Sequence, residues 1–164
     1  TFEEGGARND ASIINRDVTA DCTRHLIPAS VPQAFGLPTD FSFDTTSFQE
    51  AYAKDIKVLS FKNNIMSNLV IDTEARRAAF TSCAEVEPRE GESYTVEQAW
   101  VLYLTEDGSK IKKVIEFCDK DAILRMEAVI IHKHPLQSRQ AKCILSSEFL
   151  AMYTVIHATR RTIP

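Results

Sequence analysis

The chain has 164 residues, of which 44% are hydrophobic and 26% are charged. This length corresponds to about one domain of ordinary soluble composition. The formal net charge of −4 argues against a nucleic-acid backbone or an anionic lipid surface as a partner. No stretch reaches the ~20 apolar residues that a membrane span requires, and the N-terminal residues lack the features of a secretory signal. We therefore expect a single cytoplasmic domain that binds neither nucleic acid nor membrane.

Sequence motifs for nucleotide cofactors, metals and disulfides are absent. The sequence contains no G-x-G-x-x-G, P-loop or G-x-S-x-G motif. The cysteines form no C-x-x-C pair and are irregularly spaced, which is typical of buried free thiols. His132 and His134 have no carboxylate or cysteine at ligand spacing nearby. We therefore expect neither a cofactor nor a bound metal.

The N-terminal part alternates between helical and extended patterns. Residues 1–17 predict a poor helix, because two adjacent glycines each cost about 1 kcal/mol relative to alanine. Residues 21–27 predict a strand that a proline ends, and the proline-containing segment 28–46 predicts a loop. An S-x-x-E capping box then begins at Ser47 and is followed by apolar residues at helical spacing. This pattern predicts an amphipathic helix over 47–60.

Four extended segments follow this helix. Strands are predicted over 65–71 and 76–86, with a turn between them. Strands over 94–105 and 110–118 form a hairpin, because an Asp-Gly pair supplies the positive φ angles of a tight turn. The order of helices and strands predicts an α+β fold, with a curved antiparallel sheet and helices packed on one face.

The C-terminal part, 121–164, is predicted to be a helical extension of the domain formed by 1–120. A helix over 121–131 and a second helix over 138–159 follow from their apolar patterns. The sequence leaves three roles open for this extension. It covers the core, lines the mouth of a pocket or packs on a partner subunit.

Two charged residues stand on strand faces that are otherwise apolar. The period-2 alternation of a strand places Arg24 and Glu116 each between two apolar neighbours. A buried charge costs several kcal/mol unless it is paired or reaches water in a cavity. Two interpretations follow. Either the two residues form a structural ion pair, or they converge with Tyr94 and Gln98 in a concave pocket.

Five short blocks of this sequence, within residues 7–120, match the successive blocks of a known family. They are Asp21-Cys-Thr-Arg-His-Leu-Ile-Pro-Ala-Ser, Asp72-Thr-Glu-Ala-Arg-Arg, Tyr94-Thr-Val-Glu-Gln, Asp107-Gly and Glu116-Phe-Cys-Asp. In this order they resemble fungal SnoaL-like proteins of the nuclear-transport-factor-2-like superfamily. The resemblance implies a cone-shaped α+β fold with helices on its concave side, a small homodimer and a cofactor-free isomerase or cyclase. It also implies a substrate from meroterpenoid, alkaloid or polyketide biosynthesis.

The resemblance also implies the roles of individual residues. Glu116 would be the general acid or base, with a pKa raised by the apolar cone. Arg24 would stabilise negative charge that develops on the substrate, and Tyr94 would donate a hydrogen bond or a proton. The second tyrosine of the family's motif is replaced here by a glutamine that cannot transfer protons. The residues expected to contact the substrate are Gln98, Trp100, His25, Phe80 and Leu102.

Two further functions stay open beside the isomerase or cyclase. Because the second tyrosine of the motif is missing, a non-catalytic ligand-binding or dimerisation module with the same fold is one alternative. The other is a dehydratase or aldol-type cyclase, which would use the same residues on a carbonyl substrate. In every case we expect a small-molecule partner.

Overall fold

The computed structural model describes residues 1–132. Within it, Thr1–Glu127 form one compact unit and a second unit begins at Ala128. The predicted helix over 121–131 is present, as α4 (Lys120–His132). The remainder of the predicted C-terminal extension lies outside the described residues, and the domain boundary expected at residue 120 stays a prediction.

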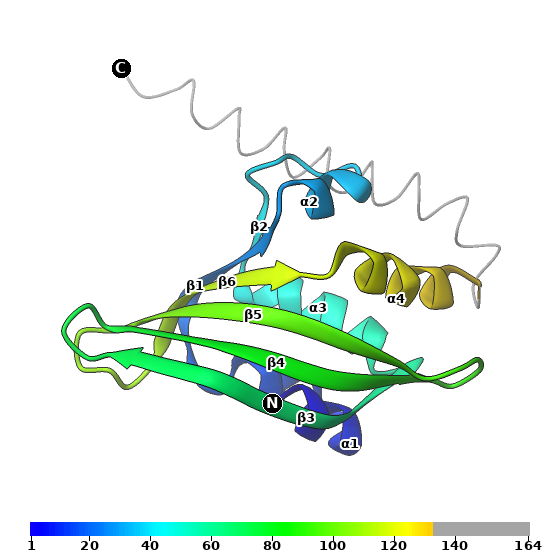
Figure 1. The fold of residues 1–164 in the computed structure, drawn as a ribbon, viewed down its shortest axis with the longest axis horizontal. Coiled ribbons are helices and arrows are strands. Elements are labelled where there is room, and N and C mark those ends of the chain that lie inside the picture. Colours follow the sequence, from blue (N-terminus) through cyan, green and yellow to red (C-terminus); the bar gives the residue numbers. More distant parts are fainter. Residues whose placement is uncertain (133–164) are drawn as a thin grey trace. The chain divides into compact units, whose positions relative to one another are not determined.

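Among residues 1–132 the sheet contains six strands, in the order β2-β1-β6-β5-β4-β3 (Figure 1). All neighbouring strands are antiparallel except β1 and β6, which run parallel. The sheet is curved and unclosed, so the predicted α+β fold class is confirmed. In chain order the elements before α4 are α1 (Phe2–Arg8), the 3-10 helix η1 (Ala11–Asn15), β1 (Val18–Ile27), α2 (Ser30–Ala34), β2 (Ser42–Phe43), α3 (Thr45–Asp55), β3 (Leu59–Asp72), β4 (Arg77–Pro88), β5 (Tyr94–Leu104) and β6 (Ile111–Cys118).

The strands agree with the sequence pattern, and β3 is longer than predicted. The hairpin of β5 and β6 closes through a turn in which Gly108 has a φ of 73°, as the Asp-Gly pair predicts. Strand β3 begins at Leu59, six residues before its predicted start, because Leu59 pairs with Pro88 and Phe61 pairs with Val86. The ladder to β4 therefore extends back almost to the end of α3.

The predicted bounds of the helix over 47–60 were wrong at both ends. Helix α3 begins earlier because Asp44, not Ser47, is its N-cap. The Asp44 carboxylate accepts a hydrogen bond from the Ser47 backbone N–H at 2.7 Å, and the Ser47 hydroxyl accepts one from the Asp44 N–H at 3.1 Å. Ser47 is thus the third helical residue of a capping box that begins three residues upstream. The helix ends at Asp55, because the following segment enters β3.

The segment predicted as a loop, 28–46, contains two short elements. Helix α2 forms although it contains Pro32, because a proline within the first turn removes only an N–H that has no helical partner. Both Val31 and Pro32 are fully buried. Strand β2 pairs with β1, with Phe43 opposite Arg24. This pairing makes β2 the edge strand, next to the strand that carries Arg24.

The helices α1, η1 and α3 pack on one face of the sheet and form an aromatic core with it. The Phe2 ring of α1 lies within 5.4 Å of Tyr52, 5.8 Å of Phe61 and 6.1 Å of Trp100, measured between centroids. Ile14 of η1 belongs to the same buried cluster. We refer to the sheet face beneath these helices as the inner face. No helix among residues 1–132 is long and apolar enough to cross a membrane.

Helix α1 forms in the segment predicted to be a poor helix, and its close approach to α3 explains the glycine there. A Cβ on Gly5 would lie 2.5 Å from the Tyr52 hydroxyl oxygen and 3.1 Å from the Asp10 carbonyl oxygen. Tyr52 cannot easily move away, because it is 1% exposed and its hydroxyl donates a hydrogen bond to the Phe2 carbonyl. The contact with α3 thus compensates for the low helix propensity of Gly5.

This close approach predicts opposite effects for the two adjacent glycines. Gly5→Ala should lower the free energy of unfolding by about 1–3 kcal/mol, because the added methyl group overpacks a buried site. Gly6→Ala is the matched control, since its Cβ would meet only Ile56, at 3.8 Å. That variant should gain up to about 1 kcal/mol from helix propensity. Urea unfolding of both variants measures this difference, and equal effects would contradict the proposed role of Gly5.

Candidate active site

The pairing of β5 and β6 places the polar residues of the candidate site side by side on the inner face. Glu116 is paired with Trp100, and Cys118 is paired with Gln98. Paired residues share a face of the sheet, so these four side chains form two adjacent rows. Glu116 is only 5% exposed. The predicted burial of this carboxyl group is therefore confirmed.

The Glu116 carboxyl group is held by two neighbouring side chains. The Gln98 amide donates a hydrogen bond to Glu116 Oε1, and the Cys118 thiol donates one to the same oxygen at 3.5 Å. Burial raises the pKa of Glu116 to about 7, although the bonds from Cys118 and Gln98 and the charge of Arg24 act in the opposite direction. A carboxyl group with this pKa can both accept and return a proton near neutral pH.

Arg24 of β1 is a second buried charge on the inner face, with 6% exposure. Its Nη2 donates a hydrogen bond to the Ile14 carbonyl at 2.9 Å, and its guanidinium lies 4.3 Å from the centroid of the Phe48 ring. Its Nε has no hydrogen-bond partner among the described residues. Within residues 1–132 no ion pair joins Arg24 to Glu116, so the structural ion pair considered from the sequence does not form. The two groups interact only through their charges.

Tyr94 lies on the inner face but at a separate position. It is the first residue of β5, four residues before Gln98, which corresponds to a separation of about 13 Å along the strand. Its hydroxyl oxygen is buried and has no hydrogen-bond partner among the described residues. Burial raises the pKa of this hydroxyl group. In residues 1–132 the structure shows no contact that joins Tyr94 to Glu116.

Three of the expected substrate contacts are packed in the core. Trp100 is 8% exposed, stacks on Phe80 at 6.1 Å and donates a hydrogen bond from Nε1 to the Ser82 hydroxyl at 2.7 Å. Phe80 and Leu102 pack against the same buried cluster. These side chains therefore form an apolar surface beside Glu116.

His25 is not part of the inner-face site. Its position in β1 gives it the opposite strand parity from Arg24, and its ring lies 3.2 Å from the Thr23 hydroxyl group. Burial and the nearby charge of Lys113 lower its pKa. A contact between His25 and a substrate on the inner face would need a twist or bulge of β1 that turns the side chain inward. The pairing of His25 with Ile115 is regular, so the strand keeps the side chain outside.

Asp55, the last residue of α3, is a titratable residue with a raised pKa that sequence reasoning did not identify. The residue as a whole is half-buried, and burial of its carboxyl group raises the pKa to about 7. Its charge raises the pKa of both Tyr52 and Tyr94. Its spacing in the sequence could have identified it. Asp55 follows Tyr52 by three residues, so the two side chains share a face of the helix.

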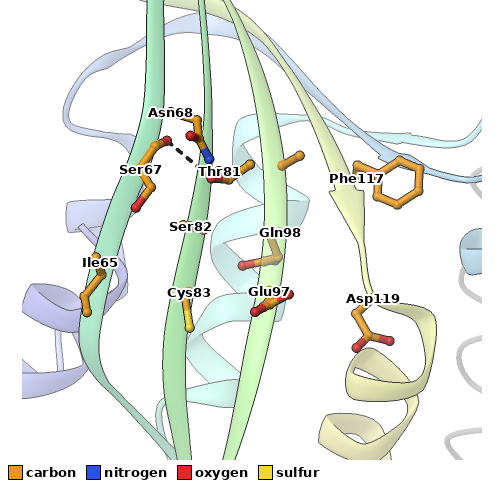
Figure 2. A pocket seen from close by; sticks show the side chains of 11 residues that line it. Ile65, Ser67, Asn68, Thr81, Ser82, Cys83, Glu97, Gln98, Phe117 and Asp119 are labelled. Carbon is orange, nitrogen blue, oxygen red and sulfur yellow. Dashed lines mark hydrogen bonds between the residues drawn. The ribbon is translucent and has the colours of Figure 1, made fainter.

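A hollow on the described surface lies on the opposite, outer face of the sheet (Figure 2). It has a volume of about 750 Å³, and α3 lies behind the strands in this view. Its lining includes Glu97 and Asp119 but not Glu116, Arg24 or Tyr94. Among the described residues, no group of histidine, cysteine, aspartate and glutamate side chains could hold a metal ion.

The architecture is that of a known fold. The chain is similar to a pinacolase, BvnE, from Penicillium brevicompactum, with 17% identity, 78% of this chain and 87% of that chain covered, and a TM-score of 0.63. PrhC from Penicillium brasilianum has 17% identity over 89% of each chain and a TM-score of 0.60. An NTF2-like protein of unknown function from Burkholderia pseudomallei has 12% identity, with 76% and 90% of the two chains covered and a TM-score of 0.56.

These similarities show the fold of the chain. It has the nuclear-transport-factor-2-like, or SnoaL-like, fold that the five sequence blocks indicate. No protein-family model matches the sequence, and no curated protein matches it significantly.

Proposed function

We propose that the protein is a cofactor-independent isomerase or cyclase that acts by acid–base catalysis on a bulky secondary-metabolite intermediate. The observation that carries this proposal is the burial of the Glu116 carboxyl group. This group has a pKa of about 7, and it shares the inner face with a buried guanidinium whose Nε lacks an acceptor. A proton acceptor together with a free cationic donor is suited to reactions that pass through an enolate or alkoxide.

The proposed mechanism uses three side chains. The Glu116 carboxylate removes a proton from the substrate, and the electron pair left behind moves onto a substrate oxygen. Arg24 Nε donates a hydrogen bond to that oxygen and stabilises its negative charge. The proton on Glu116 then returns to another atom of the substrate, so the product is an isomer of the substrate. Gln98 fixes the orientation of the carboxyl group through its hydrogen bond.

The fungal neighbour named as a pinacolase supports a rearrangement rather than a redox reaction. A meroterpenoid, alkaloid or polyketide intermediate is mainly apolar and so fits the aromatic and apolar side chains of the inner face. The packing of Phe2 against Trp100 lies next to the site, so we expect part of this contact to open when a bulky substrate binds.

We also propose that the protein forms a homodimer. Large apolar side chains are exposed on β3 and at the end of β6, which favours an interface with a second copy. Sedimentation at micromolar concentration should give about twice the chain mass of 18.4 kDa. A mass of one chain would contradict the dimer. The exposed side chains are Ile65, Met66, Leu69, Val70, Ile71 and Phe117.

The experiment that tests the catalytic proposal is expression of the neighbouring biosynthetic genes with and without this gene. An isomerase or cyclase should yield a new product of unchanged mass only when this gene is present. A product lighter by one water would support the dehydratase alternative. Retention of a pathway intermediate on the purified protein, without any new product, would contradict catalysis and support the ligand-binding module.

A further inference from the structure

The two side chains that donate hydrogen bonds to the Glu116 carboxyl group both bind the same oxygen atom. The Gln98 amide and the Cys118 thiol each donate to Oε1, the thiol at 3.5 Å. The thiol also lies 3.6 Å from the Glu116 backbone carbonyl oxygen, so its proton is shared between these two acceptors. A carboxylate oxygen that accepts two hydrogen bonds uses both of its lone pairs. The arrangement therefore distinguishes Oε1 from the second carboxyl oxygen, Oε2.

The Cys118 thiol remains a donor throughout the pH range in which Glu116 ionises. Cys118 is 1% exposed, and burial together with the neighbouring Glu116 raises the pKa of its thiol. The thiol therefore stays protonated when Glu116 loses its proton, and it does not act as a nucleophile near neutral pH. Its hydrogen bond and that of Gln98 both act against the rise in the pKa of Glu116 that burial causes.

The pairing of the strands places these donors and Arg24 on opposite sides of Glu116. Cys118 is paired with Gln98, and the two form a row of the inner face two residues beyond Glu116 along β6. Arg24 is paired with Val114, so it belongs to the row two residues before Glu116. The two hydrogen bonds turn Oε1 toward the row of Cys118 and Gln98. Oε2 is the oxygen that is turned away from this row.

We infer that Cys118 and Gln98 are positioning residues that hold Oε1 of Glu116, so that Oε2 is the oxygen that removes and returns the substrate proton. This inference rests on the proposed function and specifies its proton transfer. The proton moves from the substrate to Oε2, and the electron pair of the broken bond moves onto the substrate oxygen beside Arg24. The proton then returns from Oε2 to another atom of the substrate. The reacting atoms therefore lie over the part of the inner face between Glu116 and Arg24.

Infrared spectroscopy identifies the protonated oxygen without any turnover. At about pH 5 Glu116 is protonated, and its C=O stretching band is the one absent from Glu116→Gln. If the proton is on Oε2, the C=O oxygen is Oε1, which accepts the bond from Cys118. Loss of this donor in Cys118→Ala should then move the band to a higher frequency. An unchanged band would place the proton on Oε1 and overturn the inference.

The pKa of Glu116 measures the strength of the bond from the thiol. NMR titration of isotopically labelled glutamate carboxyl groups gives this pKa, and the signal of Glu116 is again the one absent from Glu116→Gln. Cys118→Ala should raise the pKa from about 7 to nearly 8, because one lost hydrogen bond shifts an ionisation equilibrium up to about 10-fold. Cys118→Ser keeps a donor on the same Cβ atom and should return the pKa to about 7 or lower. A role in packing alone would give the same pKa in both variants and would overturn the inference.

Cys22→Ala is the matched control. Cys22 is also fully buried, but its thiol donates to the Thr23 carbonyl at 3.8 Å rather than to Glu116. This variant should leave the C=O band and the pKa of Glu116 unchanged. Other titratable groups on the elements around Glu116 are present in every variant, so their charges do not alter the comparison. They are Arg24 of β1, Tyr94 of β5, and Tyr52 and Asp55 of α3.

The S–H stretching bands give a measurement that needs no variant of Cys118, should those variants not fold. Ionisation of Glu116 strengthens the bond that the thiol donates, because the acceptor becomes charged. One S–H band should therefore move to a lower frequency as the pH rises through about 7, and no band should do so in Glu116→Gln. S–H bands that do not respond to pH in the wild-type protein would overturn the role of Cys118.

These measurements separate the inference from the proposed function. The expected bands and pKa values without any new product would support the positioning of Glu116 and contradict the isomerase. A new product, together with an unchanged C=O band and an unchanged pKa in Cys118→Ala, would overturn the inference and leave the isomerase standing.

Discussion

Glu116→Gln should reduce the rate of product formation by about 10²–10⁴-fold, the usual contribution of a positioned acid or base. The expected loss is large because glutamine keeps the shape of the side chain but cannot carry the transferred proton. Its amide oxygen can still accept the hydrogen bonds that Gln98 and Cys118 donate to Glu116. The variant should therefore fold, and the loss should be in the chemical step.

The pH dependence of turnover gives a second signature of the same group. If Glu116 acts as the base, kcat/KM of the wild-type protein should rise with pH through about 7 and then level off. Glu97→Gln is the matched control, because Glu97 is exposed on the outer face of the adjacent strand. That variant should keep the wild-type rate. A folded Glu116→Gln protein with more than a tenth of the wild-type rate would show that Glu116 is not the base.

The sequence identified Arg24 and Glu116 because a strand repeats every two residues. A charge at an inward position breaks this alternation, and the break is visible without any knowledge of tertiary contacts. The hairpin of β5 and β6 also followed from a local signal, the Asp-Gly turn. The parallel pairing of β1 with β6, which brings Arg24 to the same sheet, joins segments far apart in sequence and has no local signal.

The sequence did not predict the partners of the site residues, because these partners come from other elements. Arg24 donates a hydrogen bond to the Ile14 carbonyl of η1 rather than to Glu116. Because every residue has a backbone carbonyl, the sequence does not indicate which one accepts this bond. The low helix propensity of Gly5 did not prevent helix α1 from forming, and the close approach of Tyr52 that makes glycine necessary appears only after packing. The cation–π contact between Arg125 and Tyr94 is likewise a property of packing.

The stability of the wild-type protein should fall with rising pH where Glu116 loses its proton. Its pKa is raised from 4.5 to about 7 in the folded state, so the folded protein binds this proton more tightly than the unfolded chain. The stabilisation is complete below about pH 4.5 and is lost as the pH rises to about 7. A tenfold change in acidity corresponds to about 1.4 kcal/mol, so the loss amounts to as much as about 3 kcal/mol.

Comparison with Glu116→Gln isolates this contribution. Urea unfolding of both proteins between pH 4 and pH 8 should show that the variant gains stability relative to the wild type as the pH rises. The difference between the two free energies should grow by up to about 3 kcal/mol. Asp55 also has a raised pKa, but it is present in both proteins and its contribution cancels.

A difference that stays constant over this range would mean that Glu116 ionises near its ordinary pKa, and the acid–base proposal would lose its physical basis. The expected result would connect stability and function at one residue. Ionised Glu116 is the form that removes a proton, and it is also the form that the buried inner face stabilises least. Ionised, buried Glu116 therefore costs the free protein stability at neutral pH. In the complex, proton transfer to Glu116 moves the negative charge onto the substrate oxygen beside Arg24, and this cost is removed.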